Sequence, residues 1–310
     1  MNPLALHEFH TALHAHFVEV NGAEVVEDYG DWASELAALH QAAGVLDLSC
    51  RSRLCLTGTD QVRFLHGQVT NDIRRLRTGE GCYAAVVSAK GRMEGDCNIY
   101  RLPEELLLDF EPGLQQALTR RLEKFVVSDD VQVVDVAALC GLLSVQGPRS
   151  DAVLRALGSF GELPASPFGF AVVSDPLLGE MYLMNQPRLG TCGFDLFVPT
   201  ASLGVVADKL IAAARPVGGR PCGWRALEVA RIEAGVPRFG ADMDDRNLPA
   251  ECGIESRAVN YEKGCYIGQE VINRLHTMGH VNRKLCGLRL SASLPQPPAK
   301  DDKLVSAAPG

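Results

Sequence analysis

The chain has 310 residues, of which 46% are hydrophobic and 22% are charged, and its formal net charge is −8. These proportions are those of an ordinary globular protein and exclude a disordered, collagen-like or coiled-coil chain. The negative charge argues against a protein that binds nucleic acid or an anionic membrane through whole-molecule attraction, so we expect neither partner. The length predicts about two domains.

The sequence also indicates a reducing compartment. It has no apolar run of about 18 residues, and its N-terminus lacks the basic start and apolar stretch of a secretory signal. The ten cysteines are spread through the chain without a C-x-x-C pair, a pattern that favours reduced thiols over disulfides or a cysteine-rich metal site. We therefore expect a cytoplasmic protein without a resident metal.

The first segment is predicted to be an amphipathic helix, because its apolar residues recur at helical spacing. These residues are Leu6, Phe9, Leu13 and Phe17. Three histidines form a neighbouring stripe, namely His7, His10 and His14. No carboxylate or cysteine stands at a matching spacing, so the stripe is interpreted as a solvated helix face and not as a metal site.

The following segments mix strands and helices. Residues 53–67 and 141–158 each predict a strand, a glycine turn and a helix. Residues 83–102 and 104–112 have strand patterns, and Lys90-Gly91-Arg92 provides a hairpin turn. A helix is expected over 114–125 and a further strand over 131–136. Strands joined by turns favour an α+β fold with antiparallel pairing over a doubly wound α/β sheet.

The second half has fewer regular patterns. A stretch rich in proline and glycine follows Gly158, after which residues 193–199 predict a strand. Residues 224–235 predict a helix that ends at Gly235. Residues 285–290 look like the first strand of a new unit, and the remaining tail is too short to complete it.

One segment, residues 261–276, concentrates reactive residue types. Lys263 stands two residues before Cys265, and a neighbouring cation would favour the thiolate form of the cysteine. Gly264 and Gly268 would let the backbone approach a ligand closely. A glycine-rich turn that contains a buried, unreactive cysteine is the structural alternative. Residue spacing alone does not decide between the two interpretations.

Residues 263–270, KGCYIGQE, resemble the K-G-C-Y-x-G-Q-E motif of the YgfZ-type folate-binding proteins. These proteins are relatives of the glycine-cleavage T-protein and support iron–sulfur cluster proteins. The resemblance covers most of the chain in family order. Its segments are GVLDLS near residue 44, TND at 70–72, SVQGP at 144–148 and ARIEAGVPRFGADMDDRNLPAE at 230–251.

The resemblance implies a fold and a domain plan. We expect an α+β, T-protein-like multidomain cloverleaf around a central folate cavity, with a C-terminal β-barrel that looks truncated. The first α+β folate-binding region would span residues 1–140. The second, which contains the KGCYIGQE segment, would span 141–282, and residues 283–310 would begin the incomplete barrel.

The resemblance also implies site residues. T-proteins carry paired aspartates where this chain has only Asp96, and a pterin-binding glutamate where it has Asp195. A carboxylate suits the adjacent N–H donors of a pterin ring. Arg231 could meet folate carboxylates, and Glu233 lies beside it on the same helix. Four residues of the KGCYIGQE segment are further candidates for cofactor binding, namely Tyr266, Gly268, Gln269 and Glu270.

Three functional hypotheses follow. The first is a tetrahydrofolate-binding accessory factor for assembly or repair of [4Fe–4S] proteins, in which Cys265 reacts and Lys263 tunes it. Its partners would be iron–sulfur cluster assembly proteins and [4Fe–4S] client enzymes. The second is a tetrahydrofolate-dependent aminomethyltransferase that uses Asp96. The third is a scaffold that binds folate without catalysis.

Overall fold

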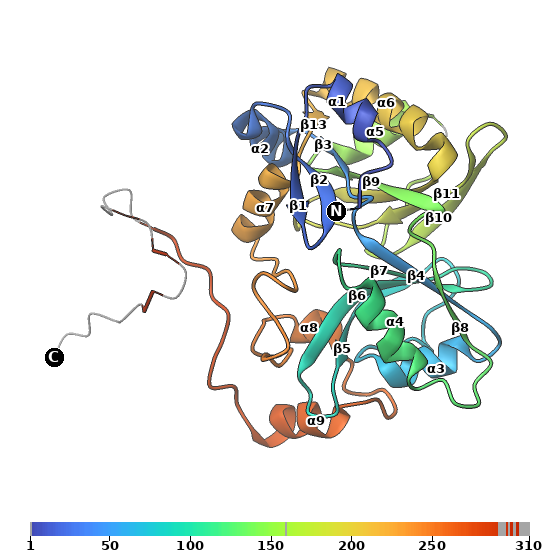
Figure 1. The fold of residues 1–310 in the computed structure, drawn as a ribbon, viewed down its shortest axis with the longest axis vertical. Helices are drawn as coiled ribbons and strands as arrows, with labels where there is room; N and C mark the ends of the chain where they lie inside the picture. The colour runs from blue at the N-terminus through green and yellow to red at the C-terminus, as the bar shows by residue number, and fades with distance from the viewer. Residues whose placement is uncertain (1, 159, 291–295, 297, 300–301, 304–310) are drawn as a thin grey trace.

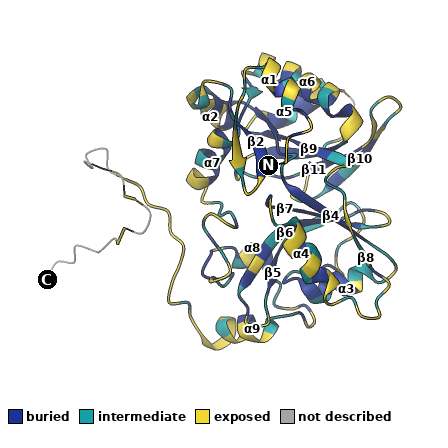
Figure 2. Ribbon diagram, viewed as in Figure 1, coloured by how far each residue is buried: buried dark blue, intermediate teal, exposed yellow. Residues whose placement is uncertain are grey.

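The computed structural model describes residues 2–158 and 160–290, together with residues 296, 298–299 and 302–303. Two main sheets lie one above the other in Figure 1, and helices pack against each of them. Both sheets are largely buried, whereas the helices expose their outer faces (Figure 2).

The lower sheet in Figure 1 has five antiparallel strands in the order β5-β6-β7-β4-β8. The strands are β4 (Ser52–Thr57), β5 (Gly81–Val87), β6 (Met93–Arg101), β7 (Leu106–Phe110) and β8 (Gln132–Asp135). Two helices cover it, α3 (Gln61–Gln68) and α4 (Gln115–Glu123). Their apolar residues, Phe64, Leu65, Leu118 and Leu122, share one core with the strands. Burial of that apolar surface is what holds the helices against the sheet.

The upper sheet has six strands in the order β10-β11-β12-β9-β3-β13. They are β3 (Gly44–Asp47), β9 (Cys140–Gln146), β10 (Phe170–Asp175), β11 (Gly179–Asn185), β12 (Gly193–Pro199) and β13 (Arg220–Pro221). One of its cores includes residues of α5 (Ser150–Ala156) and α6 (Leu203–Ala214). A second core includes α2 (Trp32–Gln41) and α7 (Trp224–Glu233) together with Tyr100 and Leu107 of the lower sheet. This second core joins the two sheets.

The remaining elements are short. The N-terminus forms α1 (His7–Ala12) and a hairpin of β1 (His16–Val20) and β2 (Ala23–Asp28). Two 3-10 turns, η1 (Thr200–Ser202) and η2 (Arg215–Val217), flank α6. Near the C-terminus lie α8 (Glu255–Ala258) and α9 (Gln269–Met278). Residues of both share a core with β5 and β6, so this late segment packs against the lower sheet.

The α+β class and several predicted elements are confirmed. The hairpin at Lys90-Gly91-Arg92 joins β5 to β6, and the helices expected over 114–125 and 224–235 form as α4 and α7. The N-terminal prediction is wrong in part, because the helix ends at Ala12 and Phe17 lies in β1. His10 is likewise not solvated: it is buried, and its Nε2 lies 2.9 Å from Asp47.

Two further predictions differ from the structure. The stretch after Gly158 contains β10, β11 and α6, to which the sequence pattern assigned no element. Residues 285–290 form no strand, although the Leu285 amide donates to the Glu251 carbonyl at 2.8 Å. Most of the predicted barrel opening lies outside the described residues. The division at residues 140 and 282 stays a prediction.

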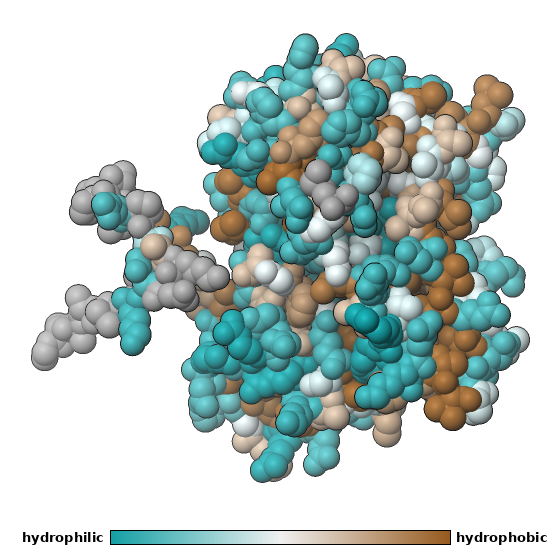
Figure 3. Space-filling view, in the orientation of Figure 1, coloured by the Kyte–Doolittle hydropathy of each residue, from teal (hydrophilic) through white to brown (hydrophobic). Residues whose placement is uncertain are grey.

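None of the helices in the described part of the chain is both long enough and apolar enough to cross a bilayer. The face in Figure 3 is mainly hydrophilic, with hydrophobic residues gathered toward its right-hand edge.

Candidate functional site

Asp195 is a fully buried carboxylate in the middle of β12. The antiparallel register places it opposite Ser144 of β9, and the Ser144 hydroxyl donates to its Oδ1 at 2.7 Å. Burial raises the pKa of Asp195, and the nearby Arg188 opposes that rise. A buried carboxylate needs donors to offset its lost hydration. Ser144 supplies one of them.

Arg188 supplies the others. It lies in the loop between β11 and β12, and its guanidinium contacts both Asp195 oxygens, with Nη2 2.6 Å from Oδ2 and Nε 3.1 Å from Oδ1. The same Nη2 lies 3.0 Å from Asp109 of β7 in the lower sheet. Arg188 therefore bridges carboxylates of the two sheets.

These contacts belong to a continuous chain of alternating charges. In order of contact it runs Asp195, Arg188, Asp109, Arg51, Glu111, Arg238, Glu228, Arg231 and Asp242. Each neighbour pair lies within 4 Å, so four arginines neutralise four of five carboxylates. The chain connects both sheets to α7 and the loop after it. One carboxylate is in excess, which favours a ligand that brings N–H donors.

A small cavity of about 80 Å³ lies along this chain. Six charged members of the chain line it, Arg231 among them, and Leu48, Trp224 and Leu227 add apolar surface. Sites for drug-sized ligands usually measure about 300–1,000 Å³. The cavity therefore has the chemistry of a binding site, but side chains must move before a large ligand can enter.

Asp96 lies on β6 beside this chain. The Tyr83 hydroxyl of neighbouring β5 donates to its Oδ2 at 2.6 Å. Burial raises the pKa of Asp96 to about 6, although the Tyr83 hydrogen bond opposes the rise. Glu111 raises the pKa further and Arg51 lowers it, and both residues line the cavity. A carboxyl with a pKa of about 6 can give and take protons near neutral pH.

We expect the Asp96 carboxyl to titrate at about pH 6 in the wild type. Tyr83→Phe should raise that pKa, because the variant lacks the hydroxyl that stabilises the ionised form. The carbon-13 chemical shift of the Asp96 carboxyl, followed by NMR against pH, measures both values. A wild-type midpoint near 4 would contradict this assignment.

Arg231 and Glu233 occupy different faces of α7. Arg231 is buried, contacts Glu228 at 2.8 Å and Asp242, and lines the cavity. Glu233 is exposed and pairs with His40 at 3.0 Å. The structure thus brings Arg231 to the cavity and places Glu233 on the surface.

Lys263 of the KGCYIGQE segment is buried, and its ammonium donates to the carbonyls of His66 and Val69 at 2.5 and 2.6 Å. These carbonyls lie at the C-terminal end of α3, where a cation is favourable. Burial lowers the pKa of Lys263 to about 8, which Asp72 partly opposes. The ammonium lies 4.7 Å from the centre of the Tyr266 ring.

Cys265 is exposed, so the alternative of a buried cysteine is wrong. Its flanking residues Lys263 and Tyr266 are both buried, and Tyr266 joins the core with β5 and β6. Gly268 has φ +83°, and a Cβ there would lie 2.4 Å from the Ser88 carbonyl oxygen. The segment is therefore fixed on both sides of Cys265 while the thiol faces solvent.

The other candidates of this segment surround the start of α9. The Gln269 side chain lies 3.5 Å from the Lys263 carbonyl oxygen, and Glu270 is exposed. The Tyr266 hydroxyl has no hydrogen-bond partner within the described part of the chain. None of the residues 263–270 lines the 80 Å³ cavity. Of the predicted site residues, Arg231 lines this cavity, whereas those of the KGCYIGQE segment lie at or just before the start of α9.

Sequence reasoning missed much of the charge chain. Arg188, Asp109, Arg51 and Glu111 were not singled out, although Asp109 interrupts the apolar run LLLDF. Every residue of that strand is buried. A charged side chain inside a buried strand needs an oppositely charged or hydrogen-bonding partner. The pattern LLLDF could therefore have identified Asp109.

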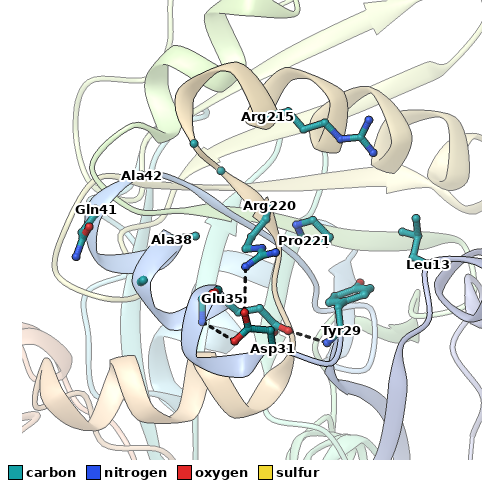
Figure 4. Close-up of a pocket in the computed structure, with 14 residues that line it drawn as sticks. Leu13, Tyr29, Asp31, Glu35, Ala38, Gln41, Ala42, Arg215, Arg220 and Pro221 are labelled. Carbon is teal, nitrogen blue, oxygen red and sulfur yellow. Dashed lines mark hydrogen bonds and ion pairs between the residues drawn. The ribbon is translucent and has the colours of Figure 1, made fainter.

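A larger cavity of about 820 Å³ lies between α2 and β13 (Figure 4). Its side chains include Tyr29, Asp31, Glu35 and Arg220, and Arg220 contacts Asp31 at 4.0 Å. None of the predicted site residues lines this cavity. No group of three or more His, Cys, Asp or Glu residues suited to a metal occurs among the described residues.

Comparison with known proteins connects this geometry to one family. The family profile described as the GCVT N-terminal domain matches residues 6–263. An aminomethyltransferase of Cupriavidus necator is 30% identical over 265 residues, which cover 80% of this chain and 69% of that protein. An aminomethyltransferase of Thermotoga maritima is 28% identical, with 94% and 79% covered.

A solved structure supports the same fold. The glycine cleavage system aminomethyltransferase T of Bartonella henselae aligns with a TM-score of 0.79 at 22% identity. The alignment covers 90% of this chain and 75% of that one. The expected T-protein-like fold is therefore confirmed.

Proposed function

The chain belongs to the GCVT N-terminal domain family, and from this membership we propose that it binds a reduced folate in the cavity between its two sheets. Tetrahydrofolate is the ligand that members of this family take in general. The observation that carries the proposal is the buried Asp195, whose carboxylate is bound by Arg188, a residue that lines a cavity with an apolar wall.

The residues of the cavity suit the chemistry of tetrahydrofolate. Next to the lining residue Arg188, Asp195 offers acceptors to the N–H donors of a pterin ring. Trp224 and Leu227 offer surface to its aromatic parts, and Arg231 or Arg238 could pair with its carboxylates. The present volume is too small, so binding requires that charged side chains reorganise. Bound folate would supply a nitrogen that accepts or releases a one-carbon group.

We further propose that the protein serves [4Fe–4S] proteins as an accessory factor, with Cys265 as its reactive group. The KGCYIGQE segment supports this function, because its buried neighbours hold an exposed thiol in a fixed place. A thiolate is a ligand for iron and a nucleophile toward sulfur. One cysteine cannot hold a cluster alone, so the partners would be cluster assembly proteins and their client enzymes.

Aminomethyl transfer is the second candidate function. The names of the relatives support it more directly than they support an iron–sulfur role. Within this chain, the observation that favours it is the Asp96 carboxyl, which is hydrogen-bonded to Tyr83 and has a pKa of about 6. That group could move a proton at a folate nitrogen.

Turnover separates the two candidates. We expect purified protein that has bound tetrahydrofolate to form no methylenetetrahydrofolate from a protein-bound aminomethyl donor, measured by liquid chromatography and mass spectrometry. A purified aminomethyltransferase serves as the positive control. Steady turnover that Asp96→Asn abolishes would establish the transferase function and refute the accessory one.

A further inference from the structure

Arg188 occupies the acceptor face of Asp195 in the same way that a ligand would. Its Nε and Nη2 form a planar pair of donors against the two carboxylate oxygens, at distances of 2.6–3.1 Å. The remaining donor on Asp195 is the Ser144 hydroxyl. Both carboxylate oxygens of Asp195 therefore already accept hydrogen bonds from Arg188 or Ser144. A folate that binds to Asp195 must replace one of these donors.

The donor edge of a pterin has the same chemistry as this guanidinium. The ring carries an amino group at C2 beside an N–H at N3, so it presents two parallel N–H donors from a planar C–N framework. A carboxylate accepts such a pair in the two-point geometry that it uses for arginine. The two groups compete for one acceptor, because Asp195 is fully buried and has no second exposed face.

We propose that Arg188 is an internal stand-in for the pterin, which closes the folate site until the ring displaces it from Asp195. This inference rests on the proposed folate binding and adds the residue that gates it. Displacement leaves Arg188 with a partner, because Asp109 lies 3.0 Å from the same Nη2. Arg188 can therefore give up its contact with Asp195 and still keep an anionic partner in Asp109.

The position of Arg188 suits such a movement. It lies in the β11–β12 loop, where Gly190 follows, and its side chain lines the cavity of about 80 Å³. Leu189 beside it is buried in the core that joins the two sheets, so the backbone is anchored. Rotation of the arginine side chain away from Asp195, with the backbone held, would extend this cavity to the Asp195 carboxylate.

The first test is the affinity for tetrahydrofolate, measured by calorimetry under anaerobic conditions. Arg188→Lys should bind at least about tenfold more tightly than the wild type, because a gate that is open in a tenth of molecules or fewer weakens the apparent affinity by that factor. Lysine keeps a charge for Asp109 but cannot make the two-point contact. Arg63→Gln is the matched control, since Arg63 also pairs with two aspartates but is exposed. Unchanged or weaker binding by Arg188→Lys would overturn the gate.

The second test uses the wild type and does not depend on a variant that folds. The Nε–H of Arg188 should be protected from solvent exchange in nitrogen-15 NMR spectra, and saturating tetrahydrofolate should abolish that protection. The fragment p-aminobenzoylglutamate, which lacks the pterin, should leave it intact. If tetrahydrofolate binds while the Arg188 signal stays unchanged, the gate is refuted and folate binding stands. If neither the wild type nor Arg188→Lys binds tetrahydrofolate, both proposals fail.

Discussion

Cys265→Ser is expected to abolish the rescue of [4Fe–4S] enzyme activity in cells that lack their own factor of this kind. The wild-type chain should restore that activity. Serine keeps the size of the side chain but replaces the thiolate, which is the group able to bind iron or attack sulfur. The exposed position of Cys265 means that the substitution should leave folding intact. Activity of a [4Fe–4S] dehydratase in cell extracts measures the effect.

Cys286→Ser is the matched control, because Cys286 is the other exposed cysteine of the described residues. It should rescue as well as the wild type. Equal rescue by Cys265→Ser would refute a reactive role for this thiol and favour the folate-binding scaffold. Immunoblots of both variants exclude differences in protein level.

Asp109→Asn is expected to destabilise the protein by about 3–5 kcal/mol, the usual cost of breaking one partner out of a buried ion pair. Asp109 is fully buried, and its carboxylate contacts Arg51 at 2.7 Å and Arg188 at 3.0 Å. The neutral amide would deprive Arg51 and Arg188 of a negatively charged partner. The free energy of unfolding, measured in urea, tests this. Asp129→Asn, which removes one of the two partners of the exposed Arg63, should cost about 1 kcal/mol or less.

The ion pairs of Asp109 with Arg51 and Arg188 also predict how the free energy of unfolding depends on pH. Burial acts to raise the pKa of Asp109, but Arg51 and Arg188 outweigh it and hold the pKa at about 2, below the ordinary value of 3.8. A carboxyl with a lowered folded pKa stabilises the protein above its unfolded pKa and loses that effect as the pH falls. The stability gap between wild type and Asp109→Asn should be constant above about pH 5 and shrink toward pH 2. A gap independent of pH would contradict the ion pair.

Local sequence patterns predicted the elements whose apolar periodicity is regular. The strand and hairpin around Lys90-Gly91-Arg92 and the helix α7 formed as expected. The helix predicted through Phe17 failed because the chain reverses at His14, which has φ +61°, and then enters the β1–β2 hairpin. Pairing between strands is a tertiary interaction and overrides helical spacing.

The sequence predicted those candidate site residues that belong to a recognisable motif. It did not predict those whose role depends on a contact with a residue far away in the chain. Arg231 lines the cavity, and Asp195 contacts the cavity residue Arg188, but a role for either in folate binding stays a prediction. Lys263 was expected beside the thiolate, but its ammonium donates to the end of α3. Arg188 gave no local signal, because its role comes from Asp109, a residue 79 positions away that only the folded chain brings near.

Binding of tetrahydrofolate to the wild type and to Asp195→Asn, measured side by side by calorimetry, tests the central claim most directly. We predict one folate per chain for the wild type and at least about tenfold weaker binding by the variant, since the amide cannot accept two N–H donors as a carboxylate does. Circular dichroism of both proteins confirms that the variant is folded. Absence of wild-type binding, or equal affinity of the two proteins, would contradict a folate site at Asp195.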